Sequence, residues 1–161
     1  MNRRVFLSLG AVLSTASAFF GFFGHRGADR WQLLQSMQNH LFPGHDNFPS
    51  AEDVRSVRYL KMVSRDRSFD QKDLKFIFEG VDELVRRGWR DRLSRRRKEE
   101  IMQQFAATTF GSNWIATVLN YTFEALLGDP IYGGNMHQRG WKALRHHPGI
   151  PRPKVPFGRL S

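Results

Sequence analysis

The sequence contains no cysteine among its 161 residues. This absence excludes disulfide bonds, a cysteine-ligated cluster and covalent haem attachment. We therefore expect any redox cofactor to belong to another chain. Acidic residues are also scarce, because 15 aspartates and glutamates stand against 25 lysines and arginines, which gives a formal net charge of +10. Such a charge suits an anionic partner, whether nucleic acid, a membrane surface or an acidic protein face.

Several motifs of catalysis and nucleotide binding are also missing. The sequence has neither the dinucleotide fingerprint Gly-x-Gly-x-x-Gly nor a phosphate-binding loop that ends in Gly-Lys-Ser/Thr. No serine lies in a Gly-x-Ser-x-Gly elbow, and there is no thiol nucleophile. His137, His146 and His147 are candidate metal ligands, but no carboxylate stands beside them, so we expect no metal site. The sequence therefore predicts no catalysis by this chain alone.

What the sequence does contain is enough apolar surface for one folded domain. Aromatic residues make up 13% of the chain, which is typical of a folding sequence and not of a disordered tail. Apolar residues recur every three or four positions, which predicts helices. These helices are expected at residues 28–42, 51–63, 71–87, 94–105 and 113–127, with a short one after Trp141 through Arg145. We therefore predict an all-α domain over residues 28–161, an irregular bundle of about five helices.

Local signals add detail to this prediction. Ser50 and Ser94 are good N-caps for the helices that follow them, and residues 68–70 form another capping cluster. Gly80 lies inside a predicted helix, which more often indicates close helix packing than catalysis. Residues 113–127 form the least polar segment of the domain, so we place that helix at the centre of the bundle or against another subunit.

The N-terminus has the three parts of an export signal. An uncharged run over residues 5–23 follows two arginines, and the small-residue triplet 16–18 offers a cleavage site. The arginine motif, which resembles a twin-arginine signal for export of folded proteins, comprises Arg3, Arg4, Phe6 and Leu7. We predict a signal over residues 1–18 that is cleaved after Ala18, with a retained anchor reaching residue 23 as the alternative. Export to the periplasm argues against nucleic acid as the partner.

A run of positive charge occupies residues 86–98, which we call the arginine cluster. It comprises Arg86, Arg87, Arg90, Arg92, Arg95, Arg96, Arg97 and Lys98. The cluster suits docking on anionic lipid or on an acidic partner face. A solvated helix end is the alternative, and it is favoured slightly because Glu99 and Glu100 follow at once.

The chain concentrates turn formers and large aromatics in residues 129–141, which we call the bend. Its candidate site residues are Asp129, Pro130, Tyr132, Gly133, Gly134, Asn135 and Trp141. Aspartate accepts backbone hydrogen bonds and proline ends the preceding helix, while the Gly-Gly-Asn triplet is expected to reach φ > 0. The tyrosine and tryptophan rings suit a surface that a partner covers, although packing on the chain's own helices is an equal alternative.

The bend also carries a family resemblance. The pattern Asp129-Pro130-x-Tyr132-Gly133-Gly134-Asn135, followed by Gly140-Trp141 and Pro148-Gly149, resembles the C-terminal signature of the gluconate 2-dehydrogenase subunit 3 family. A weaker match is Leu41-Phe42-Pro43 before a helix. The resemblance implies that the seven site residues of the bend are docking or loop-shaping positions.

The same resemblance implies a function as a small, non-catalytic subunit. A large subunit of the glucose-methanol-choline type would carry FAD and oxidise gluconate, another sugar or a polyol, and a multihaem cytochrome c subunit would take the electrons. The export signal of the small subunit would carry the loaded large subunit to the periplasmic side of the inner membrane. The alternative is a stand-alone periplasmic binding or membrane-surface protein that uses the arginine cluster.

The C-terminal tail is rich in proline. Four prolines between residues 146 and 156 forbid a helix and favour extended backbone. An extended basic tail suits a partner's groove, and a frayed terminus is an equal alternative.

Overall fold

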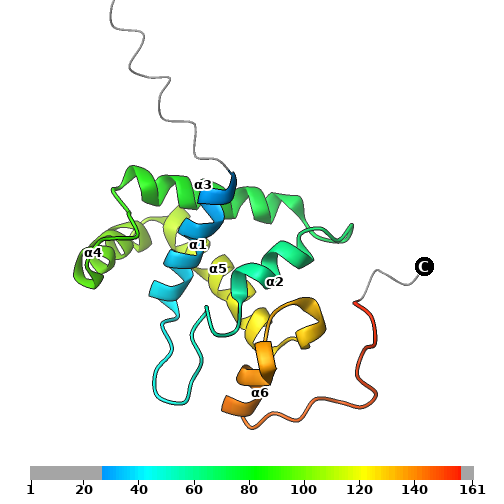
Figure 1. Cartoon of the computed structure of the whole chain (residues 1–161). Coiled ribbons are helices and arrows are strands. Elements are labelled where there is room, and N and C mark those ends of the chain that lie inside the picture. The colour runs from blue at the N-terminus through cyan, green and yellow to red at the C-terminus, as the bar shows by residue number, and fades with distance from the viewer. Residues whose placement is uncertain (1–26, 157–161) are drawn as a thin grey trace, which may run out of the picture.

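The computed structural model describes residues 27–156, which form a bundle of helices (Figure 1). The α-helices are α1 (Gly27–Leu41), α2 (Ser56–Val63), α3 (Gln71–Arg86), α4 (Arg95–Ala106), α5 (Thr109–Leu127) and α6 (Arg139–Ala143). Two single-turn 3-10 helices, η1 (Pro130–Tyr132) and η2 (Met136–Gln138), lie between α5 and α6. The described residues contain no β-strand, so the all-α prediction is confirmed.

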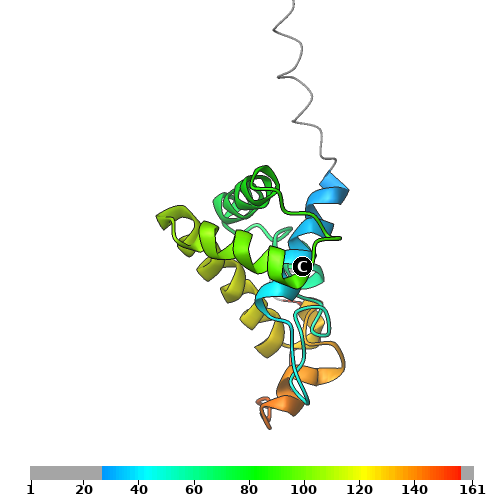
Figure 2. The ribbon, with the colours of Figure 1, turned by 90° about the vertical axis from the view of Figure 1, so that its left-hand side faces the viewer.

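Helix α5 lies at the centre of the bundle. It contacts α1, α2, α3, α4 and α6, and Figures 1 and 2 show α3 across one end of the bundle and α6 at the other. Its buried side chains include Trp114, Val118 and Leu126. The sequence placed this helix either at the centre of the bundle or against another subunit, and in the structure it lies at the centre.

The packing of α3 on α5 depends on Gly80. A β-carbon at this position would lie 2.1 Å from the ring of Trp114. The indole N–H of Trp114 donates to the carbonyl of Ile77, one turn earlier on α3, at 2.8 Å. The glycine therefore lets the largest side chain of α5 lie directly on the α3 backbone, as its place in a helix predicted.

Two predicted helix starts are confirmed. The side chain of Asp70 accepts the amide of Lys72 at the start of α3, at 2.9 Å. Ser94 accepts the amide of Arg97 at the start of α4, at 3.3 Å. Each cap satisfies one of the amides that a helix start leaves without an intrahelical partner.

The predicted start of the second helix is wrong by five residues. Ser50 and Asp53 do exchange hydrogen bonds in a capping box, but they close only a turn. Arg55 then adopts a left-handed conformation, with φ 56° and ψ 47°, and α2 begins at Ser56. A helix cannot run through a left-handed residue, so the capping signal belongs to a separate turn over residues 51–55.

A buried chain of side chains accompanies this break. The hydroxyl of Ser56 donates to Gln38 at 2.8 Å, and the Gln38 amide donates to Thr122 at 3.1 Å. All three residues are at most 1% exposed. The buried amide of Gln38 requires hydrogen-bond partners. Its two hydrogen bonds link α1, α2 and α5 at one point of the core.

Two other helix boundaries differ from the prediction. Helix α5 begins four residues earlier than expected, because Thr108 caps it through the amide of Gly111 at 2.9 Å. The last helix begins at Arg139 and ends at Ala143, so Trp141 lies within it and not before it.

Candidate partner-binding site

The bend closes the C-terminal end of α5 with its own side chains. The indole N–H of Trp141 donates to the carbonyl of Leu127 at 2.6 Å, and the amide of Asn135 donates to the carbonyl of Gly128 at 3.0 Å. These carbonyls belong to the last turn of the helix and its cap, where intrahelical donors are missing. The bend is therefore a direct structural continuation of the central helix.

Asn135 ties the end of α5 to the start of α6. Its side-chain oxygen accepts the amide of Gly140 at 2.9 Å, while its nitrogen donates to Gly128. The residue is 0% exposed and adopts left-handed geometry, with φ 44° and ψ 43°. Asparagine suits the position because it tolerates this backbone and fills both hydrogen-bonding roles.

The two glycines of the bend serve different purposes. Gly133 has φ +86°, as predicted, but Gly134 does not reach positive φ, and that part of the prediction is wrong. A β-carbon on Gly134 would instead lie 2.8 Å from the carbonyl oxygen of Ala125. Close packing against α5 therefore explains this glycine. Gly140 is similar, since its β-carbon would lie 2.0 Å from the carbonyl oxygen of Leu126.

Asp129 and Pro130 shape the first turn of the bend. Pro130 begins η1, and a carboxylate oxygen of Asp129 accepts the amide of Ile131 at 3.0 Å. Arg152 of the tail donates to both carboxylate oxygens, each at 2.9 Å, which holds the pKa of Asp129 below its ordinary value. The Arg152 guanidinium also lies 5.1 Å from the ring centre of Trp141. The tail is thus fixed to the bend by an ion pair and a cation–π contact.

The structure brings all seven predicted site residues together and places most of them inside the chain. Gly133, Gly134, Asn135 and Trp141 are buried, and Asp129, Pro130 and Tyr132 are half-buried. The contacts of the buried residues shape the loop. Partner binding by the bend stays a prediction. Because the bend is mostly buried, a protein that binds here would contact the side chains around it.

Exposed apolar side chains lie at the edge of the bend. Leu127 is 50% exposed, Phe123 one turn earlier on α5 is 43% exposed, and Leu144 after α6 is 46% exposed. Sequence reasoning did not single out these residues, because it placed residues 113–127 as one apolar segment, either at the centre of the bundle or against another subunit, and assigned no role to Leu144. Phe123 and Leu127 are four residues apart, a spacing that places them on one helix face.

A groove of about 840 Å³ lies beside the bend, between α2, α3, α5 and η1. All three tyrosines of the chain, Tyr59, Tyr121 and Tyr132, line it together with Phe69 and Met62. We call it the tyrosine groove. Sequence reasoning singled out only Tyr132, although the concentration of so rare a residue type on one surface is typical of contact sites.

The phenols of the groove are paired with carboxylates. Tyr59 donates to Glu124 at 2.9 Å, and Tyr121 donates to Asp73 at 2.7 Å. Burial raises the pKa of both phenols, and the neighbouring carboxylates raise it further. Both hydroxyls therefore stay protonated at neutral pH and remain hydrogen-bond donors.

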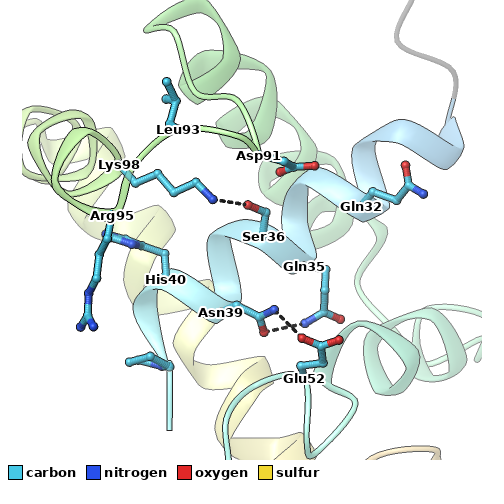
Figure 3. Close-up of a pocket in the computed structure, with 11 residues that line it drawn as sticks. Gln32, Gln35, Ser36, Asn39, His40, Glu52, Asp91, Leu93, Arg95 and Lys98 are labelled. Carbon is cyan, nitrogen blue, oxygen red and sulfur yellow. Dashed lines mark hydrogen bonds between the residues drawn. The ribbon is translucent and has the colours of Figure 1, made fainter.

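A second groove, of about 560 Å³, lies between α1 and α4 (Figure 3). Its polar side chains bond to one another. The amide of Gln35 donates to Asn39, and Asn39 donates to Glu52, each at 3.0 Å. Lys98 reaches across from α4 to Ser36 on α1 at 3.3 Å. These contacts hold α1 to α4 and to the turn that contains Glu52, so the side chains of this groove have a structural role.

Half of the eight cations in the arginine cluster form ion pairs with two neighbouring glutamates. Two of its arginines pair with Glu83 and two pair with Glu100. Arg90 donates to the backbone carbonyls of Val85 and Trp89. This pairing agrees with the interpretation of the cluster as a solvated helix end.

The candidate metal ligands lie around the bend and tail. His137 has φ 56° in η2, and the ring of His146 lies 5.8 Å from that of Trp141. Across residues 27–156, no three or more histidine, cysteine, aspartate or glutamate side chains gather in a group that could hold a metal ion.

The export signal, with Arg3, Arg4, Phe6 and Leu7, lies outside the described residues. Within residues 27–156, no helix is both long and apolar enough to cross a membrane. No protein-family model matches the sequence, and neither curated proteins nor solved structures give a match.

Proposed function

We propose that the chain is the non-catalytic small subunit of a heteromeric, membrane-associated dehydrogenase that depends on FAD. The complex oxidises gluconate, another sugar or a polyol in the periplasm. The large subunit carries the FAD, a multihaem cytochrome c subunit accepts electrons, and this chain is needed for export, folding or stability of the large subunit. The motif resemblance of the bend and the twin-arginine pattern support this proposal.

One structural observation carries the proposal: the bend is fixed by contacts inside the chain while large apolar side chains at its edge stay exposed. The carbonyl of Leu127 accepts a hydrogen bond from the Trp141 indole N–H, so the backbone of this half-exposed leucine is held by the bend. A rigid surface of this kind favours association, because removing apolar area from water contributes about 25 cal/mol per Å², against which the entropy cost of association is set.

The charge distribution of α5 supports the same surface. Charged residues make up 25% of the chain, yet the 19 residues of α5 include only one, Glu124. Its carboxylate already accepts a hydrogen bond from Tyr59. A helix face with so little charge loses little hydration when a partner covers it, and charged residues are depleted in the cores of interfaces.

Purification of the tagged full chain, expressed with its neighbouring genes, tests the proposal. We expect a yellow complex that contains a flavin-bearing polypeptide, with flavin identified by its absorbance and by mass spectrometry. A colourless single species contradicts the proposal and favours the stand-alone alternative.

Two matched variants test the surface itself. Leu127→Asp places a charge at the edge of the bend, and we expect at least about a tenfold loss of recovered flavin, since a buried unpaired charge costs more than 1.4 kcal/mol. Ala116→Asp places the same charge at an exposed position elsewhere on α5 and should leave recovery unchanged. Equal recovery from both variants would place the contact elsewhere.

A further inference from the structure

We infer that the tyrosine groove binds an arginine or lysine side chain that an extended segment of the partner polypeptide carries. This inference rests on the proposed function only for the identity of the partner, the large subunit. The groove itself is argued from its lining, its charge and its size.

The aromatic lining of the groove suits a cation. Phe69 and Tyr121 lie with ring centres 5.7 Å apart, tilted by 36°, and Tyr59 and Tyr132 line the same groove. Aromatic rings attract an ammonium or guanidinium group, because each ring has a negative face.

The carboxylates of the groove point to the same ligand. Asp66, Asp70, Asp73 and Glu124 line it, against Arg65 and Arg67. Asp73 and Glu124 each accept one hydrogen bond from a phenol. A carboxylate has about four acceptor positions, so each keeps capacity for a further donor. The phenol hydrogen bonds also hold these carboxylates beside the rings.

The contrast with the rest of the chain strengthens the charge argument. The chain carries a formal net charge of +10, yet carboxylates outnumber arginines in the groove by four to two. A basic segment is therefore favoured at this groove on a chain that is positively charged overall, which gives orientation as well as affinity.

The size of the groove indicates a peptide segment and not one isolated side chain. Its volume of about 840 Å³ lies in the range of ~300–1,000 Å³ that holds a drug-sized ligand. The groove therefore accommodates a cationic side chain together with the backbone on either side of it.

The experiment uses the full chain with ¹³C-labelled tyrosine, observed by NMR. The sequence has three tyrosines and all of them line the groove, so every labelled ring reports on the site. The probe is the capped peptide Gly-Arg-Gly-Arg-Gly at millimolar concentration. The control peptide replaces both arginines with citrulline, which has the same shape without the charge. The indole signals of the four tryptophans, none of which lines the groove, serve as the internal reference.

We expect saturable shifts of the tyrosine signals with the arginine peptide, little change with the citrulline peptide, and weaker binding as salt is added. The double variant Asp73→Asn and Glu124→Gln keeps both hydrogen-bond acceptors for the phenols and removes their charge. We expect it to bind the arginine peptide about tenfold more weakly. The control variant Glu79→Gln and Asp91→Asn makes the same change in net charge outside the groove and should bind normally.

Three results would overturn the inference: no saturable tyrosine shift, equal shifts with the citrulline peptide, or stronger binding of a glutamate peptide through Arg65 and Arg67. The two proposals fail separately. A flavoprotein that co-purifies although the peptide does not bind leaves the proposed function standing without the groove. Peptide binding without a flavoprotein leaves the groove standing with another partner.

Discussion

Gly133 and Gly134 are neighbours of the same residue type, but different physical demands select them. Gly133 has φ +86°, a region that residues with a β-carbon rarely adopt. Gly134 is not among the glycines with positive φ, but it lies against Ala125, with no room for a β-carbon. A Gly-Gly pair in a sequence predicts a sharp turn, but it does not say which of the two demands applies at each position.

Gly134→Ala should lower the free energy of unfolding by about 1–3 kcal/mol, because the added methyl group meets the α5 backbone at 2.8–2.9 Å. Urea unfolding followed by circular dichroism measures the change. Gly149→Ala is the matched control, since its methyl group would meet nothing within 4 Å. Equal stability of the two variants would mean that the bend moves away from α5 at no cost.

The ion pair of Asp129 and Arg152 predicts a pH dependence. Folding holds the pKa of Asp129 below its ordinary value of 3.8, mainly through the hydrogen bonds from Arg152. The stabilisation is therefore complete above that ordinary value and is lost as the pH falls through the lower pKa of the folded state. Between pH 7 and pH 2 we expect the wild type to lose about 1 kcal/mol more stability than Asp129→Asn.

Urea unfolding at a series of pH values measures this difference. Asparagine keeps the hydrogen bond to the amide of Ile131, so the variant isolates the charge. Asp70→Asn provides a control at another helix start, where the carboxylate also accepts an amide but forms no ion pair within residues 27–156. A parallel pH dependence of wild type and Asp129→Asn would show that the ion pair adds nothing.

At the scale of the elements, local signals predicted most helices but not all of their ends. Asp70 and Ser94 cap helices as expected, because their bonds involve residues two or three positions away. Ser50 closes only a turn, because the left-handed Arg55 interrupts the helix before Ser56. Beyond the break, Ser56 bonds to Gln38 of α1 across the core, a contact between distant parts of the chain that no pattern within residues 50–63 indicates.

Asn135 joins two elements and provides a prediction at this scale. Asn135→Ala should lower the free energy of unfolding by about 2–4 kcal/mol, because it leaves the Gly128 carbonyl and the Gly140 amide without their partner and strains the left-handed backbone. Asn135→Gly removes the same two hydrogen bonds without straining the backbone, so it should lose only about 1–3 kcal/mol.

Urea unfolding measures both losses. Asn120→Ala, at an exposed position of α5, should change the stability by less than about 0.5 kcal/mol. If Asn135→Ala matched this control, the junction of α5 and α6 would not depend on the buried amide.

At the scale of the whole molecule, the sequence predicted the bend but not the surface around it. Asp129, Pro130 and Asn135 are recognisable because turn chemistry is local. The tyrosine groove was missed because Tyr59, Tyr121 and Tyr132 lie far apart in the chain and meet only when α2, α5 and η1 pack together. The exposure of Leu127 was likewise missed, since the apolar pattern of α5 does not say which face its neighbours leave uncovered.

The proposed complex predicts how export fails. Replacing Arg3 and Arg4 by lysine should leave both this chain and the flavoprotein in the cytoplasm, because one signal serves two chains that cross the membrane already folded. Cell fractionation with antibodies against each chain measures the distribution. A variant with Lys154→Arg, which keeps the charge and lies far from the signal in sequence, should export both. Periplasmic flavoprotein in the lysine variant would contradict carriage by this chain.

The hydrogen bonds that Asn135 and Trp141 form within the chain also affect the kinetics of association with a partner. A loop that is already set before any encounter does not have to be ordered during it, so association avoids a folding step. The rate constant should then fall in the range of ordinary rigid docking, about 10⁵–10⁷ M⁻¹s⁻¹, and differences between variants should show mainly in how long the two chains remain together.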